Sequence, residues 1–171
     1  MKTFAIHENL LVKHSDHFKA AASGSWSESE SRRVEFEDWS RDVFAIFDHF
    51  LYSGKIFSAR DNDYNKDPYT DKEWGRLGSA WRLGDMLLST SFKDAVVDAM
   101  VTKLNYGIPR HLHLVFCTGG NSQSMARKLA VDVIVWKCPA GYFNKEHFGD
   151  ASEEFRWDLL SRLGKVKDTG K

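Results

Sequence analysis

The spacing of apolar and polar positions predicts a largely helical chain with short strands near its start. Residues 2–7 alternate apolar and polar side chains around Phe4 and Ile6, which is the period of a strand. Residues 34–36 (Val-Glu-Phe) alternate in the same way. Between these two segments we expect two short helices, over 8–14 and from Ser15, whose hydroxyl is a suitable N-cap.

From Ser40 onward the apolar positions recur at the helical period. Val43, Phe47, Phe50 and Leu51 share one face, and Gly54 follows where a helix C-terminus favours glycine. Two more helices are expected after a polar stretch at 58–73. The first is indicated by Trp74, Leu77, Trp81 and Leu88, and the second begins at Ser91 with Asp94 in a capping-box arrangement.

Gly107 and Pro109 interrupt the helical pattern and mark the best internal boundary. Beyond them, Met125, Leu129, Val133 and Trp136 stand at helical spacing, although the β-branched run within 131–135 also fits a buried strand. A last amphipathic helix is expected after Ser152. The sequence therefore predicts a first domain over 1–104 with a polar insertion at 58–73, a helical extension over 105–164 and a flexible tail at 165–171.

The charge balance narrows the classes of partner. The 171 residues contain 24 basic and 24 acidic side chains, so the formal net charge of zero provides no field to hold nucleic acid or an anionic membrane. Cys117 and Cys138 have no CxxC spacing, and no secretory signal or long apolar span is present. We expect free thiols and an intracellular protein, in the cytoplasm, the nucleus or both.

Three stretches together resemble the BTB/POZ family, and in particular its fungal members. They are "FAIHENLLVKHSDHFKAA", "VEFEDWSRDVFAIFDHFLYSGKI" and "LGSAWRLGDMLLSTSFKDAVVDAM", which match in order and spacing over residues 2–104. The resemblance implies an α+β fold, in which a small N-terminal sheet packs on helical hairpins and a helical extension follows. In this family a hairpin strand precedes the "FAIH" strand, so the first strand is expected to be missing here, with an open sheet edge.

The resemblance also implies a function in protein–protein interaction, without catalytic residues, metal or other cofactors. BTB adaptors recruit cullin scaffolds of ubiquitin ligases through a hydrophobic-x-Glu motif between a helix and the next strand. Trp26-Ser27-Glu28 stands at the matching offset before Val34, so these three residues are the candidate partner-binding site, together with the outer face of the helical hairpin at 74–104. The extension at 105–164 is the candidate region for a client, and relatives form homodimers through their N-terminal segments.

A plainer interpretation of Trp26 is that it packs on its own domain while the neighbouring serines and glutamates form a solvated linker. A different class of function is metal or ligand binding by the acidic loop 61–73 or by the histidines. That loop places Lys66 and Lys72 where a calcium-binding EF-hand needs glycine and glutamate. The pairs His14/His17 and His111/His113 lack cysteine partners at zinc-finger spacing, and "CTGGNSQS" at 117–124 lacks the P-loop lysine.

Overall fold

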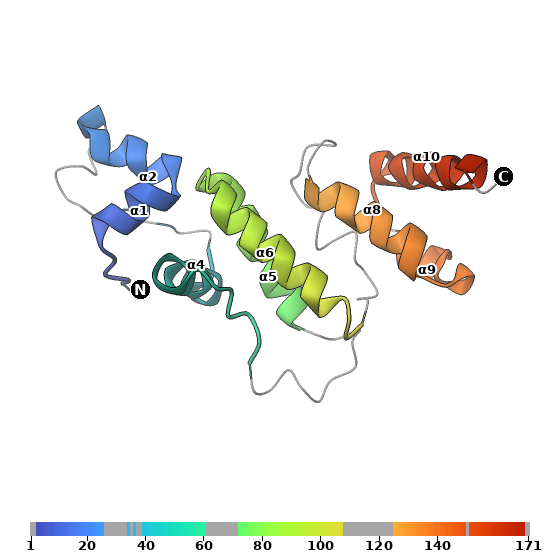
Figure 1. Ribbon diagram of the computed structural model, residues 1–171, viewed down its shortest axis with the longest axis horizontal. Helices are drawn as coiled ribbons and strands as arrows, with labels where there is room; N and C mark the ends of the chain where they lie inside the picture. The colour runs from blue at the N-terminus through green and yellow to red at the C-terminus, as the bar shows by residue number, and fades with distance from the viewer. Residues whose placement is uncertain are drawn as a thin grey trace. The chain divides into compact units, whose positions relative to one another are not determined.

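The computed structural model describes residues 3–25, 34, 36, 39–60, 72–107, 125–149 and 151–169. Their helices form two compact units, the first containing α1 to α6 and the second α8 to α10 (Figure 1). None of the described helices combines the length and apolar character needed to cross a bilayer. In chain order the helices are α1 (Glu8–His14), α2 (Asp16–Ala20), the π-helix η1 (Ala21–Ser25), α4 (Arg41–Ser53), α5 (Lys72–Met86), α6 (Thr90–Lys103), α8 (Met125–Lys137), the 3₁₀ helix η4 (Ala140–Tyr142), α9 (Lys145–Phe148) and α10 (Glu153–Thr169).

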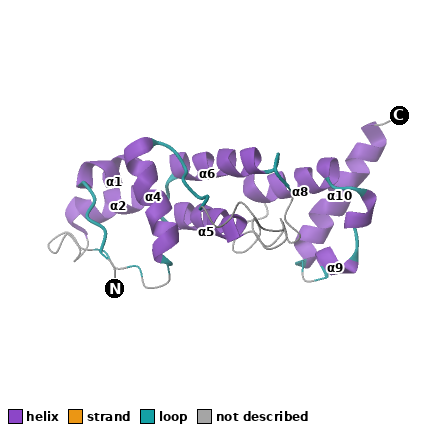
Figure 2. Ribbon diagram, turned by 90° about the horizontal axis from the view of Figure 1, so that it is seen from below, coloured by secondary structure: helices purple, strands orange, loops and turns teal. Residues whose placement is uncertain are grey.

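The predicted α+β fold with an N-terminal sheet is wrong for the described part of the chain, which contains helices and loops but no strand (Figure 2). Residues 3–7 are not paired in a sheet, and the ring of Phe4 packs against Phe44 of α4 with centroids 4.9 Å apart. Phe36 packs against the same Phe44 ring at 5.5 Å. The apolar positions Phe4 and Phe36 of the two alternating segments therefore pack on helix α4. Such a segment has the period of a strand without needing a strand partner.

Ser15 joins the first two helices to the rest of the first unit. Its buried hydroxyl accepts a hydrogen bond from the Phe18 N–H at 3.2 Å, which confirms the predicted N-cap of α2. The same hydroxyl donates to the carbonyl oxygen of Leu87, 2.6 Å away in the turn after α5. One side chain thus caps α2 and attaches it to an element distant in sequence.

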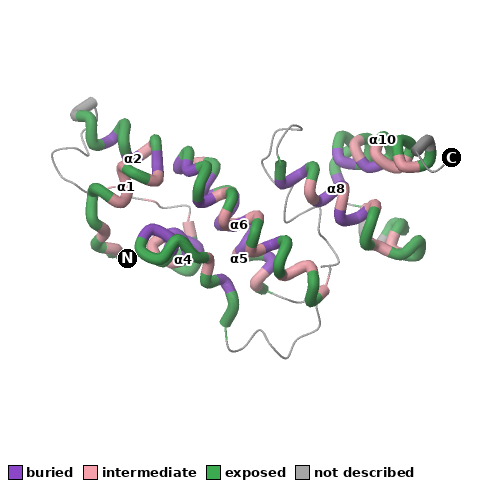
Figure 3. The backbone as a smooth tube through the Cα atoms, viewed as in Figure 1, coloured by how far each residue is buried: buried purple, intermediate pink, exposed green. Residues whose placement is uncertain are grey.

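Helix α4 carries the centre of the first core. It begins after Ser40, whose hydroxyl accepts from the Val43 N–H, and ends at Gly54 with φ of 68°, as the sequence predicts. Phe47 is fully buried, and its ring contacts those of Phe18, Phe44 and Phe92 at centroid distances of 6.5, 5.9 and 5.0 Å. Buried positions line the inner sides of α4, α5 and α6 (Figure 3).

The turn between α5 and α6 departs from the prediction. Helix α6 begins at Thr90, not at Ser91, and Ser89 occupies the N-cap position without a side-chain cap. Leu88 has φ of 51°, which lies in the left-handed region that favours glycine. Its side chain is 60% exposed. The N–H groups of Leu88 and Ser89 bond back to the carbonyls of Asp85 and Gly84, which closes α5 in a Schellman arrangement.

The second unit packs α8 against α10, and residues 131–135 are helical. The interior of this helix pair is formed mainly by small or aliphatic side chains and one aromatic ring: Ala126, Ala130, Val131, Val133, Ile134, Phe155 and Leu159. The predicted apolar face of α8 is largely wrong, because Met125 and Trp136 are exposed. The predicted Ser152 cap is confirmed, because the Ser152 hydroxyl accepts a hydrogen bond from the Phe155 N–H. Helix α10 continues to Thr169, into the residues for which the sequence predicts a tail.

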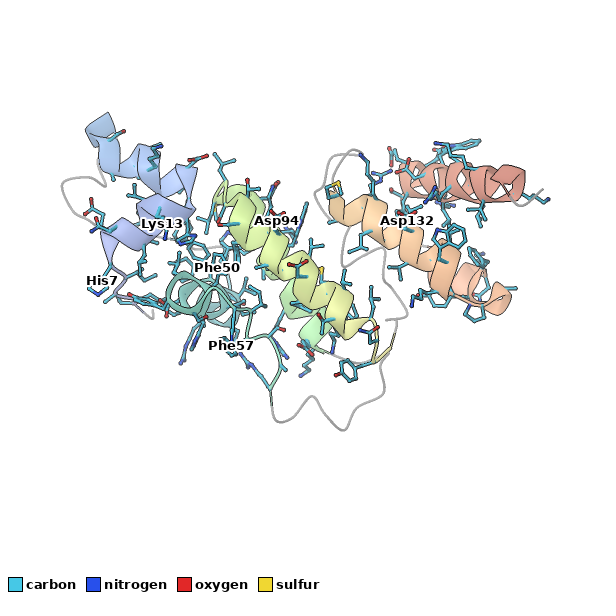
Figure 4. All side chains as sticks on the ribbon, in the orientation of Figure 1. His7, Lys13, Phe50, Phe57, Asp94 and Asp132 are labelled. Atoms are coloured by element: carbon cyan, nitrogen blue, oxygen red, sulfur yellow. The ribbon has the colours of Figure 1, made fainter. Side chains whose placement is uncertain are left out.

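Ion pairs connect the two helices of the second unit. Arg127 of α8, almost fully buried, donates to Asp158 of α10 at 2.6 Å. Asp132 lies on the side of α8 that faces α10 (Figure 4) and accepts from Arg162 at 2.6 Å, with both side chains half-exposed.

Candidate functional site

The predicted motif Trp26-Ser27-Glu28 lies outside the described residues, but both of its flanks are fixed to one aromatic cluster. Upstream, Phe18 is buried against Phe47. Downstream, the Phe36 ring meets Phe18 edge-on, with centroids 6.0 Å apart, and packs on Phe44. The two residues that flank the motif in sequence, Phe18 and Phe36, are therefore in contact.

The ends of the polar insertion are also joined. The Ser58 hydroxyl donates to the Glu73 carboxylate at 2.6 Å, and the Arg76 Nε donates to the Ser58 carbonyl oxygen at 2.9 Å. Lys103 of α6 makes a short ion pair with the same carboxylate, and its ammonium lies 5.7 Å from the centre of the Trp74 ring. Since Ser58, Glu73 and Lys103 are largely shielded from water, each polar group satisfies another, which is the pattern of a structural cluster.

A hollow of about 170 Å³ lies beside this cluster, between α4 and the segment 55–60. Arg60 spans its edge to Asp42 at 2.7 Å, and the hydrogen bond from Arg60 holds the pKa of the Asp42 carboxyl below its usual value. Phe57 covers another side and meets the His49 ring at 5.9 Å (Figure 4). These contacts hold the segment onto α4, and the hollow offers little room for a ligand.

Ring packing involves four of the histidines: His7, His14, His17 and His49. His14 lies 3.3 Å from the Ser91 hydroxyl and packs edge-on against Phe50, while His17 packs against Phe18 and Phe36. Burial, followed by the charge of Lys13, lowers the pKa of His14. Within the described residues no three His, Cys, Asp or Glu side chains come together as metal ligands. His111, His113 and the loop 61–71 lie outside the described residues.

Cys138 is a free thiol, as the sequence predicts, while Cys117 lies outside the described residues. Burial raises the pKa of the Cys138 thiol to about 11. At neutral pH this side chain is therefore protonated and a poor nucleophile.

The second unit contains a surface groove that the sequence does not predict. Phe148 of α9 packs on Phe143 and on Tyr142, with centroids 6.1 and 5.7 Å apart. The two phenylalanine rings and two leucines of α10, Leu159 and Leu160, line an open hollow of about 320 Å³ whose lining is mainly apolar. The one sequence signal is that Trp157 and Leu160 lie off the helical face that carries Phe155 and Leu159.

The hairpin of α5 and α6 presents few large apolar side chains to solvent. Val101 is exposed on α6 and Tyr106 just after its end, while Leu88 is exposed in the turn at the other end of the helix. The three are separated along the hairpin, so they form no continuous patch of the kind that marks a binding surface.

The family model for the BTB/POZ domain matches residues 1–71. No curated protein and no solved structure matched the chain. The match spans α1, α2, α4 and the motif at 26–28, so this part of the chain is similar to BTB/POZ domains. BTB domains mediate protein–protein interaction and oligomerisation and are generally not enzymes, so the first part of the chain is a protein-interaction module.

Proposed function

We propose that the protein is a substrate adaptor that brings a client to a cullin-type ubiquitin ligase, with Trp26 and Glu28 contacting the cullin. The observation that carries the proposal is the BTB/POZ match over residues 1–71, which includes this hydrophobic-x-Glu motif. A large aromatic side chain fills a pocket on the partner, and a carboxylate two residues away pairs with a cation at its rim.

The packing around the motif supports this role. Because Phe18 and Phe36 contact each other, the chain between them is tethered at both ends to the aromatic cluster around Phe47. In general, a segment whose two ends are held together has less conformational entropy to lose on binding than a free one.

Co-purification with a cullin N-terminal domain tests the proposal. The wild-type chain is expected to bind, and the double variant Trp26→Ala/Glu28→Ala is expected to bind about 30-fold more weakly, or worse, as for an interface hot spot. Ser27→Ala is expected to have a smaller effect, since this residue is the variable position of the motif.

The matched control is Ser29→Ala/Glu30→Ala, which removes the same kinds of polar group from the same segment but leaves the motif intact. It is expected to bind like the wild type. If the Trp26/Glu28 variant keeps full affinity, the motif is not the contact; if the wild-type chain binds no cullin, the adaptor function is wrong.

A further inference from the structure

We propose that the groove in the second unit binds an acidic amphipathic segment of another protein. Calling that protein the client rests on the adaptor function proposed above, whereas the docking itself does not. Residues 143–148, which include α9, line one side of the groove, and residues of α10 line the other.

The apolar character of the groove is the first support. Phe143 and Phe148 stack with an interplanar angle of 23°, and Leu160 across from them is 58% exposed. On the same helix, three residues before Leu160, Trp157 is 63% exposed. Exposed aromatic and leucine side chains that adjoin a hollow are typical of a site where a partner places an apolar side chain.

The openness of the groove favours a protein segment over a small molecule. A small-molecule site encloses most of the surface of its ligand, whereas this hollow is open to solvent, and Trp157 is exposed one helical turn before Leu160 on α10. An amphipathic helix or extended segment can cover both regions at once, because its apolar side chains recur along one face.

The charge of the lining selects the partner. Among the side chains that the structure describes, the charged ones that line the groove are both basic, Lys145 and Arg156. A segment with acidic residues beside its apolar ones would pair with both cations. A second copy of this chain fits less well, because a two-fold contact at the groove would bring two Lys145 and two Arg156 side chains together.

Selection from a random 16-residue peptide library displayed on phage tests the proposal with the full-length protein. Phage selected on the wild type are then passed over the Leu160→Asp variant, which removes phage that bind outside the groove. Leu160 is an exposed position. Enriched peptides are expected to combine large apolar residues with an excess of Asp and Glu. No enrichment over the variant, or enrichment of neutral or basic peptides, would overturn the proposal.

One enriched peptide, synthesised with a fluorescent label, then tests the charges by anisotropy. Arg156→Glu is expected to weaken binding at least tenfold, and replacing the acidic residues of the peptide by lysine is expected to restore binding to that variant. Met125→Asp is the matched control, because Met125 is 71% exposed on α8 and does not line the groove. An equal loss with the control variant would contradict the proposal, as would failure of the charge exchange to restore binding.

Two further measurements separate the alternatives. A wild-type dimer in analytical ultracentrifugation that Leu160→Asp converts to a monomer would assign the groove to a second copy and overturn the proposal. In the cullin co-purification, Leu160→Asp is expected to bind like the wild type, while Trp26→Ala/Glu28→Ala is expected to keep its affinity for the peptide. The groove and the adaptor function can therefore fail independently.

Discussion

The two units of the molecule differ in how many of their aromatic side chains are buried, because among the described residues most buried rings lie in the first unit and only Phe155 in the second. In the first unit the rings of Phe18, Phe47 and Phe92 are buried against one another. In the second unit the interior is built mainly from alanine and aliphatic side chains, and Trp136 and Trp157 are exposed. Rings that build a core stabilise a fold, whereas rings left on a surface cost little to remove and are available to a partner.

Removing one aromatic ring from each unit should give the largest difference in the free energy of unfolding. Phe47→Ala is expected to lower the free energy of unfolding by about 3–5 kcal/mol, because it leaves a cavity at the centre of the ring cluster. Trp157→Ala is expected to cost less than about 1 kcal/mol, because its side chain is largely in water. Urea denaturation followed by circular dichroism measures both. Similar losses for the two variants would remove the contrast between the units.

The stability of the second unit should depend more on an ion pair that is shielded from water than on an exposed one. Asp158→Ala leaves the buried Arg127 guanidinium without this carboxylate and is expected to cost about 1–3 kcal/mol. Asp132→Ala breaks the half-exposed pair with Arg162 and is expected to cost less than about 1 kcal/mol. Thermal unfolding of the two variants at equal ionic strength compares them, and a reversed order would show that burial of Arg127 is not decisive.

The turn after α5 should be one place in the first unit where removing an apolar side chain stabilises the fold. Leu88→Gly is expected to raise the free energy of unfolding by about 1 kcal/mol, because glycine adopts φ of 51° without strain. Leu104→Gly, at the end of α6 where φ is −58°, is expected to lower it. Chemical denaturation of both variants measures the difference, and a loss of stability in Leu88→Gly would mean that its side chain makes a contact of value.

The smallest expected effect is the pH response of His14. Its pKa is lowered in the folded state by burial and by Lys13, so the unfolded chain binds this proton more tightly. The contribution of neutral His14 is therefore complete above about pH 6.5 and declines as the pH falls below that value. His14→Gln is expected to flatten this decline in thermal melts between pH 7 and 5. An unchanged pH profile would show that other groups produce the response.

The sequence predicts the helices where a local signal marks their ends. Ser15 and Ser152 cap helices as expected, α4 begins after Ser40, and Gly54 ends it. The sequence does not predict features that depend on which other part of the fold a segment packs against. Alternation around Phe4 looks the same whether a segment pairs in a sheet or packs one face on a helix. On α8 the small residues Ala126 and Ala130 are buried, and an apolar pattern that counts only large side chains misses them.

The two candidate sites differ in how far the sequence could indicate them. Trp26-Ser27-Glu28 is continuous in the chain and was found by family resemblance, and it stays a prediction because it lies outside the described residues. The groove joins Phe143 and Phe148 to Leu160 through a short 3₁₀ turn and a four-residue helix. Such short elements leave no periodic pattern, so only the folded chain brings these residues together.

The bond between Ser58 and Glu73 has a practical consequence for engineering. Because these residues fasten the two ends of the polar insertion, we expect added residues between them to leave the Ser58–Glu73 contact in place. Each doubling of the length of such a loop costs only about 0.6 kcal/mol of closure entropy. The stretch 61–71 is therefore the preferred place to insert an epitope tag or a reporter peptide, leaving both chain ends and both candidate sites unmodified.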